Sequence, residues 1–238
     1  MTTGCRSAGR TDPGRVRRRN EDAILVRDDL GLWVVADGLG GHADGHYASA
    51  LIVERLGALR RNDDVVDFVE AIEDTLGQVN TELREAALAQ QVDVIGSTVA
   101  LVVHDPRFVL CGWVGDSRVY LHEDDDMTLL TRDHVDGGPV DVTQFGRRTR
   151  PVAGGVLTRA VGAESALHVD WAVSANRAGS QLLLCSDGIN KELSDEELHA
   201  ACGEPGDPQS RVDHLFRVAL ARPARDNLSA VIVRLDAQ

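Results

Sequence analysis

The sequence predicts an α+β fold, in which helices and strands occupy separate stretches of the chain. Two successive amphipathic helices are indicated at residues 47–59 and 65–83, where apolar residues recur at steps of three and four. Strands are indicated by apolar runs before these helices, at residues 23–26 and 32–36, and by strand-like patterns after residue 96. Because each helix has a single apolar face, the pair would cover one side of a sheet.

Length and composition favour a single domain over residues 1–238, because no linker divides the chain. Hydrophobic content of 43% and charged content of 26% are typical of a soluble globular protein. The net charge of -13 argues against nucleic-acid or membrane partners, because this surface would repel phosphate groups. The four cysteines are widely spaced, and the sequence has neither a signal peptide nor an apolar stretch of about 18 residues, so we expect a cytoplasmic protein.

A hairpin near the N-terminus is expected to gather acidic residues. The basic cluster at residues 15–19 runs directly into Glu21 and Asp22. The strands at 23–26 and 32–36 would then bring both acids close to Asp37. Taken alone, the basic cluster is typical of a solvated charge run, and Asp37 before a glycine is typical of a turn.

The remaining elements follow in order. A hairpin of strands leads into Asp116, an irregular segment at about 133–156 reads as a flap, and a buried strand leads into Asp187. Two helices and a last strand close the chain, and Ser194 with Glu197 forms a capping-box pattern. The predicted ranges are strands 98–103, 108–114, 119–121, 182–185 and 228–235, and helices 194–201 and 207–221.

Several aspartates stand where strands begin or end, and Glu21 is next to the first of them. If the sheet topology brings these ends together, an all-oxygen cluster forms that favours Mg²⁺ or Mn²⁺ over zinc. Clustered carboxylates repel one another, so such a cluster is expected to hold metal. Two ions bridged by one carboxylate would activate a water for displacement at phosphorus, and Asp37, on the tightest turn, would be the bridge. The aspartates are Asp22, Asp37, Asp116, Asp187 and Asp226.

Eight short motifs, from about Thr11 to Leu235, resemble in order those of the bacterial metal-dependent serine/threonine phosphatases of the protein phosphatase 2C type. Each motif alone is weak, whereas eight in order are specific. They are Arg17-x-x-Asn20-Glu21-Asp22, Val35-Ala36-Asp37-Gly38-Leu39-Gly40-Gly41-His42, Gly96-Ser97-Thr98, Gly115-Asp116-Ser117-Arg118, Thr131-Arg132-Asp133-His134, Leu157-Thr158-Arg159-Ala160-Val161-Gly162, Ser186-Asp187-Gly188 and Asp226-Asn227-Leu228-Ser229.

The resemblance implies a four-layer α-β-β-α sandwich, in which two mostly antiparallel sheets pack face to face with helix pairs on both outer faces. It also implies a protein serine/threonine phosphatase in which a hydroxide bound by two Mn²⁺ or Mg²⁺ ions attacks the phosphate directly.

The residue roles below are carried over from the family and are expectations. Asp37 resembles the acid that bridges both metals, and Gly38 would offer its carbonyl to one of them. The other predicted ligands are Glu21, Asp187 and Asp226, with Asp116 at a possible third ion, while Asp22 and Asn227 support the site and Arg17 grips the substrate phosphate.

Two departures from the family concern the leaving group and the substrate. Position 39 is Leu, where many eukaryotic members carry a proposed general acid, and the flap at 133–156 is short, glycine-rich and basic. The short flap and the Asp-Gly-Leu-Gly-Gly-His segment that begins at Asp37 resemble those of phosphatases that oppose Hanks-type kinases in type VI secretion clusters. We therefore expect phosphoprotein substrates, a cognate kinase and a monomeric enzyme. The alternatives are a catalytically silent phosphoprotein-binding module and a hydrolase of small phosphates.

Overall fold

The computed structural model describes residues 4–39, 44–62, 64–124, 126–136, 155–163 and 165–236. One sheet has the order β1-β11-β10-β7-β8 and the other β2-β3-β5-β6-β9, with the short β4 paired to β3. The first sheet comprises β1 (Cys5–Asp12), β7 (Arg118–Glu123), β8 (Asp126–Leu129), β10 (Gln181–Cys185) and β11 (Leu228–Leu235). The second comprises β2 (Asp22–Arg27), β3 (Leu32–Leu39), β4 (Gly96–Ser97), β5 (Val99–His104), β6 (Phe108–Val114) and β9 (Asp170–Ala175).

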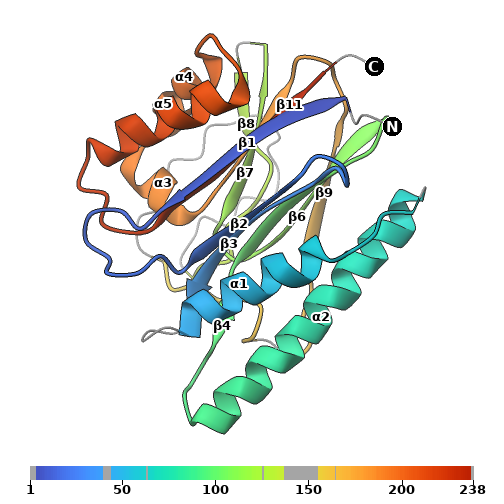
Figure 1. The fold of residues 1–238 in the computed structure, drawn as a ribbon, viewed down its shortest axis with the longest axis vertical. Coiled ribbons are helices and arrows are strands. Elements are labelled where there is room, and N and C mark those ends of the chain that lie inside the picture. The colour runs from blue at the N-terminus through green and yellow to red at the C-terminus, as the bar shows by residue number, and fades with distance from the viewer. Residues whose placement is uncertain are drawn as a thin grey trace.

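Helices cover both outer faces of the paired sheets, which confirms the predicted α-β-β-α sandwich (Figure 1). The helices over the second sheet are α1 (Asp44–Gly57) and α2 (Val65–Gln90). Those over the first sheet are α3 (Asp187–Glu192), α4 (Asp195–Gly203) and α5 (Pro208–Leu220). The strand neighbours within both sheets pair antiparallel.

Three apolar layers separate the four layers of secondary structure. The inter-sheet layer contains Trp33, Val35, Leu182 and Leu184, all fully buried. It arises because side chains alternate along β3 and β10, so that every second residue faces the other sheet. The opposite faces of the same strands pack against the helices.

Local sequence explains where the helices begin. Asp64 caps α2 through its side chain, and Asp207 caps α5 directly before Pro208 at the first turn. The predicted capping box of α4 is confirmed, because the Ser194 and Glu197 side chains each accept a backbone N–H of the other residue.

Four strands were not predicted from the sequence, namely β1, β8, β9 and the two-residue β4. The segment Cys5–Asp12 is mostly polar and the sequence indicates no strand there, yet it pairs along its whole length with β11 as β1. The edge strands β8 and β9 were also missed, because most of their residues are half-buried or exposed and give no clear apolar alternation. Most of the predicted flap, residues 137–154, lies outside the described residues.

All four cysteines are buried free thiols. Within the described ranges, α2 and the shorter helices lack the combination of length and apolarity that a membrane crossing requires.

Candidate metal and phosphate site

The β2–β3 hairpin sets two acids directly opposite each other. Asp22 pairs with Asp37 in the antiparallel register, so both side chains lie on one face of the sheet. The face is the one toward the other sheet, because Asp37 follows Trp33 and Val35 at steps of two. The predicted proximity of Asp22 and Asp37 is therefore confirmed.

The backbone of Asp37 is fixed by the Gly96-Ser97-Thr98 motif. Asp37 N–H donates to Thr98 Oγ1 at 3.2 Å, and Thr98 N–H donates back to the Asp37 carbonyl at 2.8 Å. Ser97 Oγ donates to the same carbonyl at 2.9 Å. With its main chain held on both sides, Asp37 presents its carboxylate in one position.

The other sheet contributes two further acids. Asp187 begins α3 directly after β10, and Asp226 lies two residues before β11. Between the two sheets, Ser186 Oγ donates to Asp22 Oδ2 at 2.8 Å and accepts the Ser229 N–H at 3.1 Å. These contacts join the acid-bearing ends of β2, β10 and β11.

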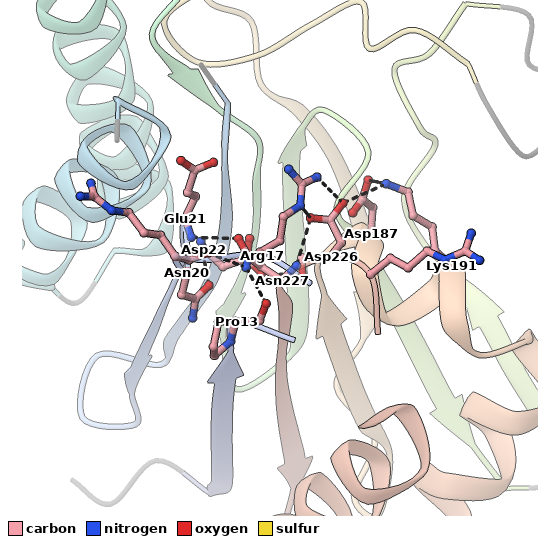
Figure 2. Close-up of polar contacts among 12 residues, drawn as sticks. Pro13, Arg17, Asn20, Glu21, Asp22, Asp187, Lys191, Asp226 and Asn227 are labelled. Atoms are coloured by element: carbon pink, nitrogen blue, oxygen red, sulfur yellow. Dashed lines mark hydrogen bonds and ion pairs between the residues drawn. The ribbon is translucent and has the colours of Figure 1, made fainter. Parts of the chain in front are cut away.

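Asn227 connects the loops that border the site (Figure 2). Its amide nitrogen donates to the carbonyls of Pro13 at 3.0 Å and Arg19 at 2.9 Å, and its side-chain oxygen accepts the Glu21 N–H at 2.9 Å. Asn227 therefore links three backbone segments beside the site, and its supporting role stays a prediction.

Two cationic side chains reach the acids of the first sheet (Figure 2). Arg17 Nε lies 2.9 Å from Asp226 Oδ1, and a second guanidinium nitrogen donates to Asp226 Oδ2 at 3.1 Å. Lys191 contacts Asp187 four residues earlier on α3, and its Nζ lies 3.6 Å from Asp226 Oδ2. Lys191 was missed from the sequence, where its four-residue spacing from Asp187 was the available signal.

Burial and mutual repulsion raise the pKa values of the clustered acids. Burial raises the pKa of Asp37 well above its ordinary value, and the charges of Asp22 and Asp187 raise it further. Burial also raises the pKa of Asp22 to about 6, although hydrogen bonds from serines oppose the shift. The pKa of Asp187 is raised by burial despite Lys191. A cation placed among these groups would relieve the repulsion.

The remaining predicted site residues take different positions. Burial and the charge of Asp187 raise the pKa of Asp116 to about 6, and Asp116 in turn raises that of Asp37, so this acid belongs to the cluster. Gly38 is buried, and a Cβ there would collide with the carbonyl oxygens of Gly45 and Glu21. The Glu21 carboxylate points away from the Arg17–Asp226 pair in Figure 2, while its carbonyl accepts the Gly38 N–H at 3.1 Å.

The donor set fits a hard divalent cation that keeps part of its water. Asp22 Oδ1 and Asp187 Oδ1 are buried with no hydrogen-bond partner, and the neighbouring donors are all oxygen. Among the described residues, no three His, Cys, Asp or Glu side chains converge on a point that would hold a metal.

Several motif residues hold the loop of Asp116 rather than the acids themselves. Arg118 forms a bidentate ion pair with Asp133, in which a terminal guanidinium nitrogen lies 2.6 Å from Asp133 Oδ2. His134 Nδ1 accepts the Gly115 N–H at 3.0 Å, and its Nε2 lies 3.1 Å from Asp170. These contacts fix the turn that carries Asp116.

Comparison with known proteins gives one family. The sequence profile described as Protein phosphatase 2C matches residues 15–231. Serine/threonine phosphatase stp of Listeria innocua is 29% identical over 238 residues, which cover 94% of this chain and 93% of that protein.

Solved structures agree with the sequence match. PppA, a key regulatory component of the type VI secretion system in Pseudomonas aeruginosa, has a TM-score of 0.87 and 37% identity over 97% of both chains. The catalytic domain of the phosphatase PstP, in complex with two manganese ions, has a TM-score of 0.82 and 27% identity, covering 98% of this chain and 99% of that one.

Proposed function

The chain belongs to the protein phosphatase 2C family and is a bacterial protein serine/threonine phosphatase, and from this premise we propose that it depends on two Mn²⁺ or Mg²⁺ ions that bind among its strand-end acids, as two manganese ions do in the related PstP. Asp37 would bridge the two ions, assisted by the Gly38 carbonyl. The further ligands would be Asp187, Asp226 and Glu21, and Asp116 would hold a third ion.

The observation that carries this proposal is the meeting of acids from both sheets. Asp37 and Asp22 come from the second sheet and Asp187 from the first, and the charge of Asp187 raises the pKa of both Asp37 and Asp22. An acid cluster at such a cost to folding is typical of a functional site.

The cations would lower the pKa of a water molecule and neutralise the oxygens of the phosphate that it attacks. Arg17 grips the substrate phosphate. Its guanidinium uses two donors on Asp226 and is half-exposed, so its other N–H groups are free to reach phosphoryl oxygens. The contact with Asp226 keeps this donor beside the acids.

Asp22 and Asn227 position the site. The buried Asp22 carboxylate accepts from Ser186, which directly precedes Asp187, and so links the hairpin to α3. Asn227 fixes the main chain next to Asp226 and Glu21 through its three hydrogen bonds. Both residues act through the groups they hold.

The physiological partner is proposed to be a Hanks-type serine/threonine kinase and its targets in a type VI secretion pathway. The support is the similarity to PppA, which extends over nearly the whole of both chains. Deletion of the gene should raise phosphothreonine on components of that pathway, and an unchanged phosphoproteome would argue against the partner.

The activity is tested by phosphate release from a phosphothreonine peptide. We expect release with Mn²⁺ or Mg²⁺, none in EDTA, and loss of release in Asp187→Asn. Full activity in EDTA would refute the metal mechanism. Comparing the phosphopeptide with p-nitrophenyl phosphate and nucleotides separates a protein phosphatase from a hydrolase of small phosphates.

A further inference from the structure

A positively charged rim borders the acid cluster of a chain whose net charge is -13. Its members are Arg15, Arg18, Arg19 and Arg225, which we call the arginine rim. All four residues are exposed, and within the described ranges none of their side chains has an ion pair or a hydrogen bond. Arg17, which lies among them in sequence, differs because it is engaged with Asp226.

Two loops hold the arginine rim in a fixed place beside the site. Arg15 N–H donates to the Ala224 carbonyl at 2.8 Å, and the Arg19 carbonyl accepts from Asn227 at 2.9 Å. Gly14 has a φ of +72° and packs so closely on the Asp226 carbonyl that a Cβ would collide with it. The backbone of the rim is therefore anchored to the segment that carries Asp226.

A cavity of about 350 Å³ lies at the same place. It is lined by Gly188, Lys191, Glu192, Pro223, Arg225 and Asp226, so it reaches an acid of the site on one side and the rim on the other. Glu192 Oε1 accepts the Arg225 N–H at 3.2 Å, and Lys191 is engaged with Asp187. The guanidinium of Arg225 is the cation of this cavity that has no acidic partner in the described part of the chain.

The arginines of the rim have no acidic partner among the described residues, and a carboxylate matches the planar array of donors on a guanidinium group. The chain as a whole has a net charge of -13 and would on balance repel an acidic peptide, whereas the rim would attract it toward the site. We propose that the arginine rim and the adjoining cavity bind acidic residues that flank the phosphorylated residue of a protein substrate. This inference rests on the proposed phosphatase function and adds a preference among its substrates.

The test uses two phosphothreonine peptides that differ only in having Asp or Asn at the flanking positions. With Mn²⁺ present, the kcat/KM ratio of the Asp peptide to the Asn peptide should be about tenfold, the scale of one or two charge-assisted hydrogen bonds. The ratio should fall as salt is raised, because screening shortens the reach of exposed charges to about 10 Å at 0.1 M ionic strength.

Arg225→Glu, and separately Arg18→Ala with Arg19→Ala, should bring this ratio to about one. Both peptides are measured on the same enzyme, so a change in the folded fraction cancels. Arg84→Glu is the matched control, because Arg84 is exposed on α2, on the opposite outer face from α3, and the charge change is the same (Figure 1). This control should keep the parent ratio.

Two results would overturn the inference while leaving the phosphatase function intact: equal kcat/KM for both peptides in the parent, or an unchanged ratio in Arg225→Glu and in the double variant. A fall in the ratio that Arg84→Glu reproduces would also overturn it, since net charge alone would then explain the preference. Failure to hydrolyse either peptide would remove the proposed function together with this inference.

Discussion

The inter-sheet layer and the acid cluster are built from the same strands, yet their residues serve different ends. Along β3, Trp33 and Val35 fill the layer and Asp37, on the same face, opens the cluster. Along β10, Leu182 and Leu184 fill the layer, and Ser186 then reaches Asp22. Apolar burial stabilises the first region, whereas burial of carboxyls opposes folding in the second.

Because of this difference, substitutions in the two regions should affect stability and activity separately. A substitution in the inter-sheet layer is expected to change the free energy of unfolding, and one in the acid cluster to change catalysis. Natural active sites commonly give up stability in this way.

The largest expected effect is that of Asp37→Asn. Phosphate release should fall by about 10²–10³-fold, as when a group that stabilises transition-state charge is removed. The free energy of unfolding in EDTA should not fall, because the amide removes a buried charge repelled by Asp22 and Asp187. The measurements are the steady-state rate and urea unfolding. A loss of unfolding free energy as large as that of a core variant would contradict this prediction, because the acid cluster would then stabilise the fold as the inter-sheet layer does.

Leu182→Ala tests the opposite region. Leu182 is fully buried at the far end of β10 from Asp187, so the variant should lose about 2–5 kcal/mol of unfolding free energy through the cavity it leaves. The kcat per folded molecule should be unchanged, because no acid moves. Chemical denaturation and active-site-normalised rates check this, and a catalytic defect in fully folded Leu182→Ala would contradict it.

The pH dependence of stability sharpens the comparison further. Asp22 has a folded pKa of about 6, above its ordinary value of 3.8, so between these values the native state keeps a proton that the unfolded chain releases. The free energy of unfolding of metal-free protein therefore falls as pH rises through this window, and Asp37 adds to the fall in the same direction.

Burial lowers the pKa values of His104 and His134, which opposes this trend below about pH 6.5. The quantity to measure is thus the difference in melting temperature between parent and Asp37→Asn from pH 5 to 7, in which the histidine contributions cancel. The difference should shift in favour of Asp37→Asn as pH rises. Leu182→Ala should keep the pH dependence of the parent, and a flat difference for Asp37→Asn would argue against the cluster.

The smallest effect is expected outside both regions, at the capping box of α4. Ser194→Ala removes one side of the box and should cost about 1 kcal/mol of unfolding free energy with no change in kcat. Thermal unfolding would detect it, with Ser194→Asp as a control that retains a capping oxygen. A loss of activity in Ser194→Ala would contradict this prediction, because it would mean that α4 influences the site.

The sequence predicted the apolar elements well and the polar ones poorly. The strand at 228–235 and the helices α1 and α5 have strong periodicity, and the structure places them within a few residues of the prediction. The helix α2 begins where predicted but extends to Gln90, beyond the predicted end at residue 83. The strand β1 was missed because, of the residues Cys5–Asp12, only Cys5 and Ala8 are buried. Its position is therefore set by pairing with β11 rather than by a local apolar pattern.

The contacts of the site likewise divide into those that local sequence predicts and those that depend on packing between the sheets. The Asp22–Asp37 pair followed from hairpin geometry, because residues opposite in a short hairpin are close in sequence. The approach of Asp187 and Asp226 to that pair depends on packing between two sheets, which no local period reveals. The residues alone indicated it only on the condition that the sheet topology brings the strand ends together, and the family resemblance made it an expectation. Lys191 was missed for a similar reason, since a lysine in a six-residue helix reads as a surface residue.

Titration calorimetry of Mn²⁺ into metal-free protein tests the central claim most directly, because it reports on the acid cluster without requiring turnover. Parent and Leu182→Ala should bind Mn²⁺ alike, and Asp37→Asn should bind it at least about tenfold more weakly. Equal Mn²⁺ affinity in parent and Asp37→Asn would contradict the assignment of Asp37 as the bridging ligand and, with it, the proposed metal site.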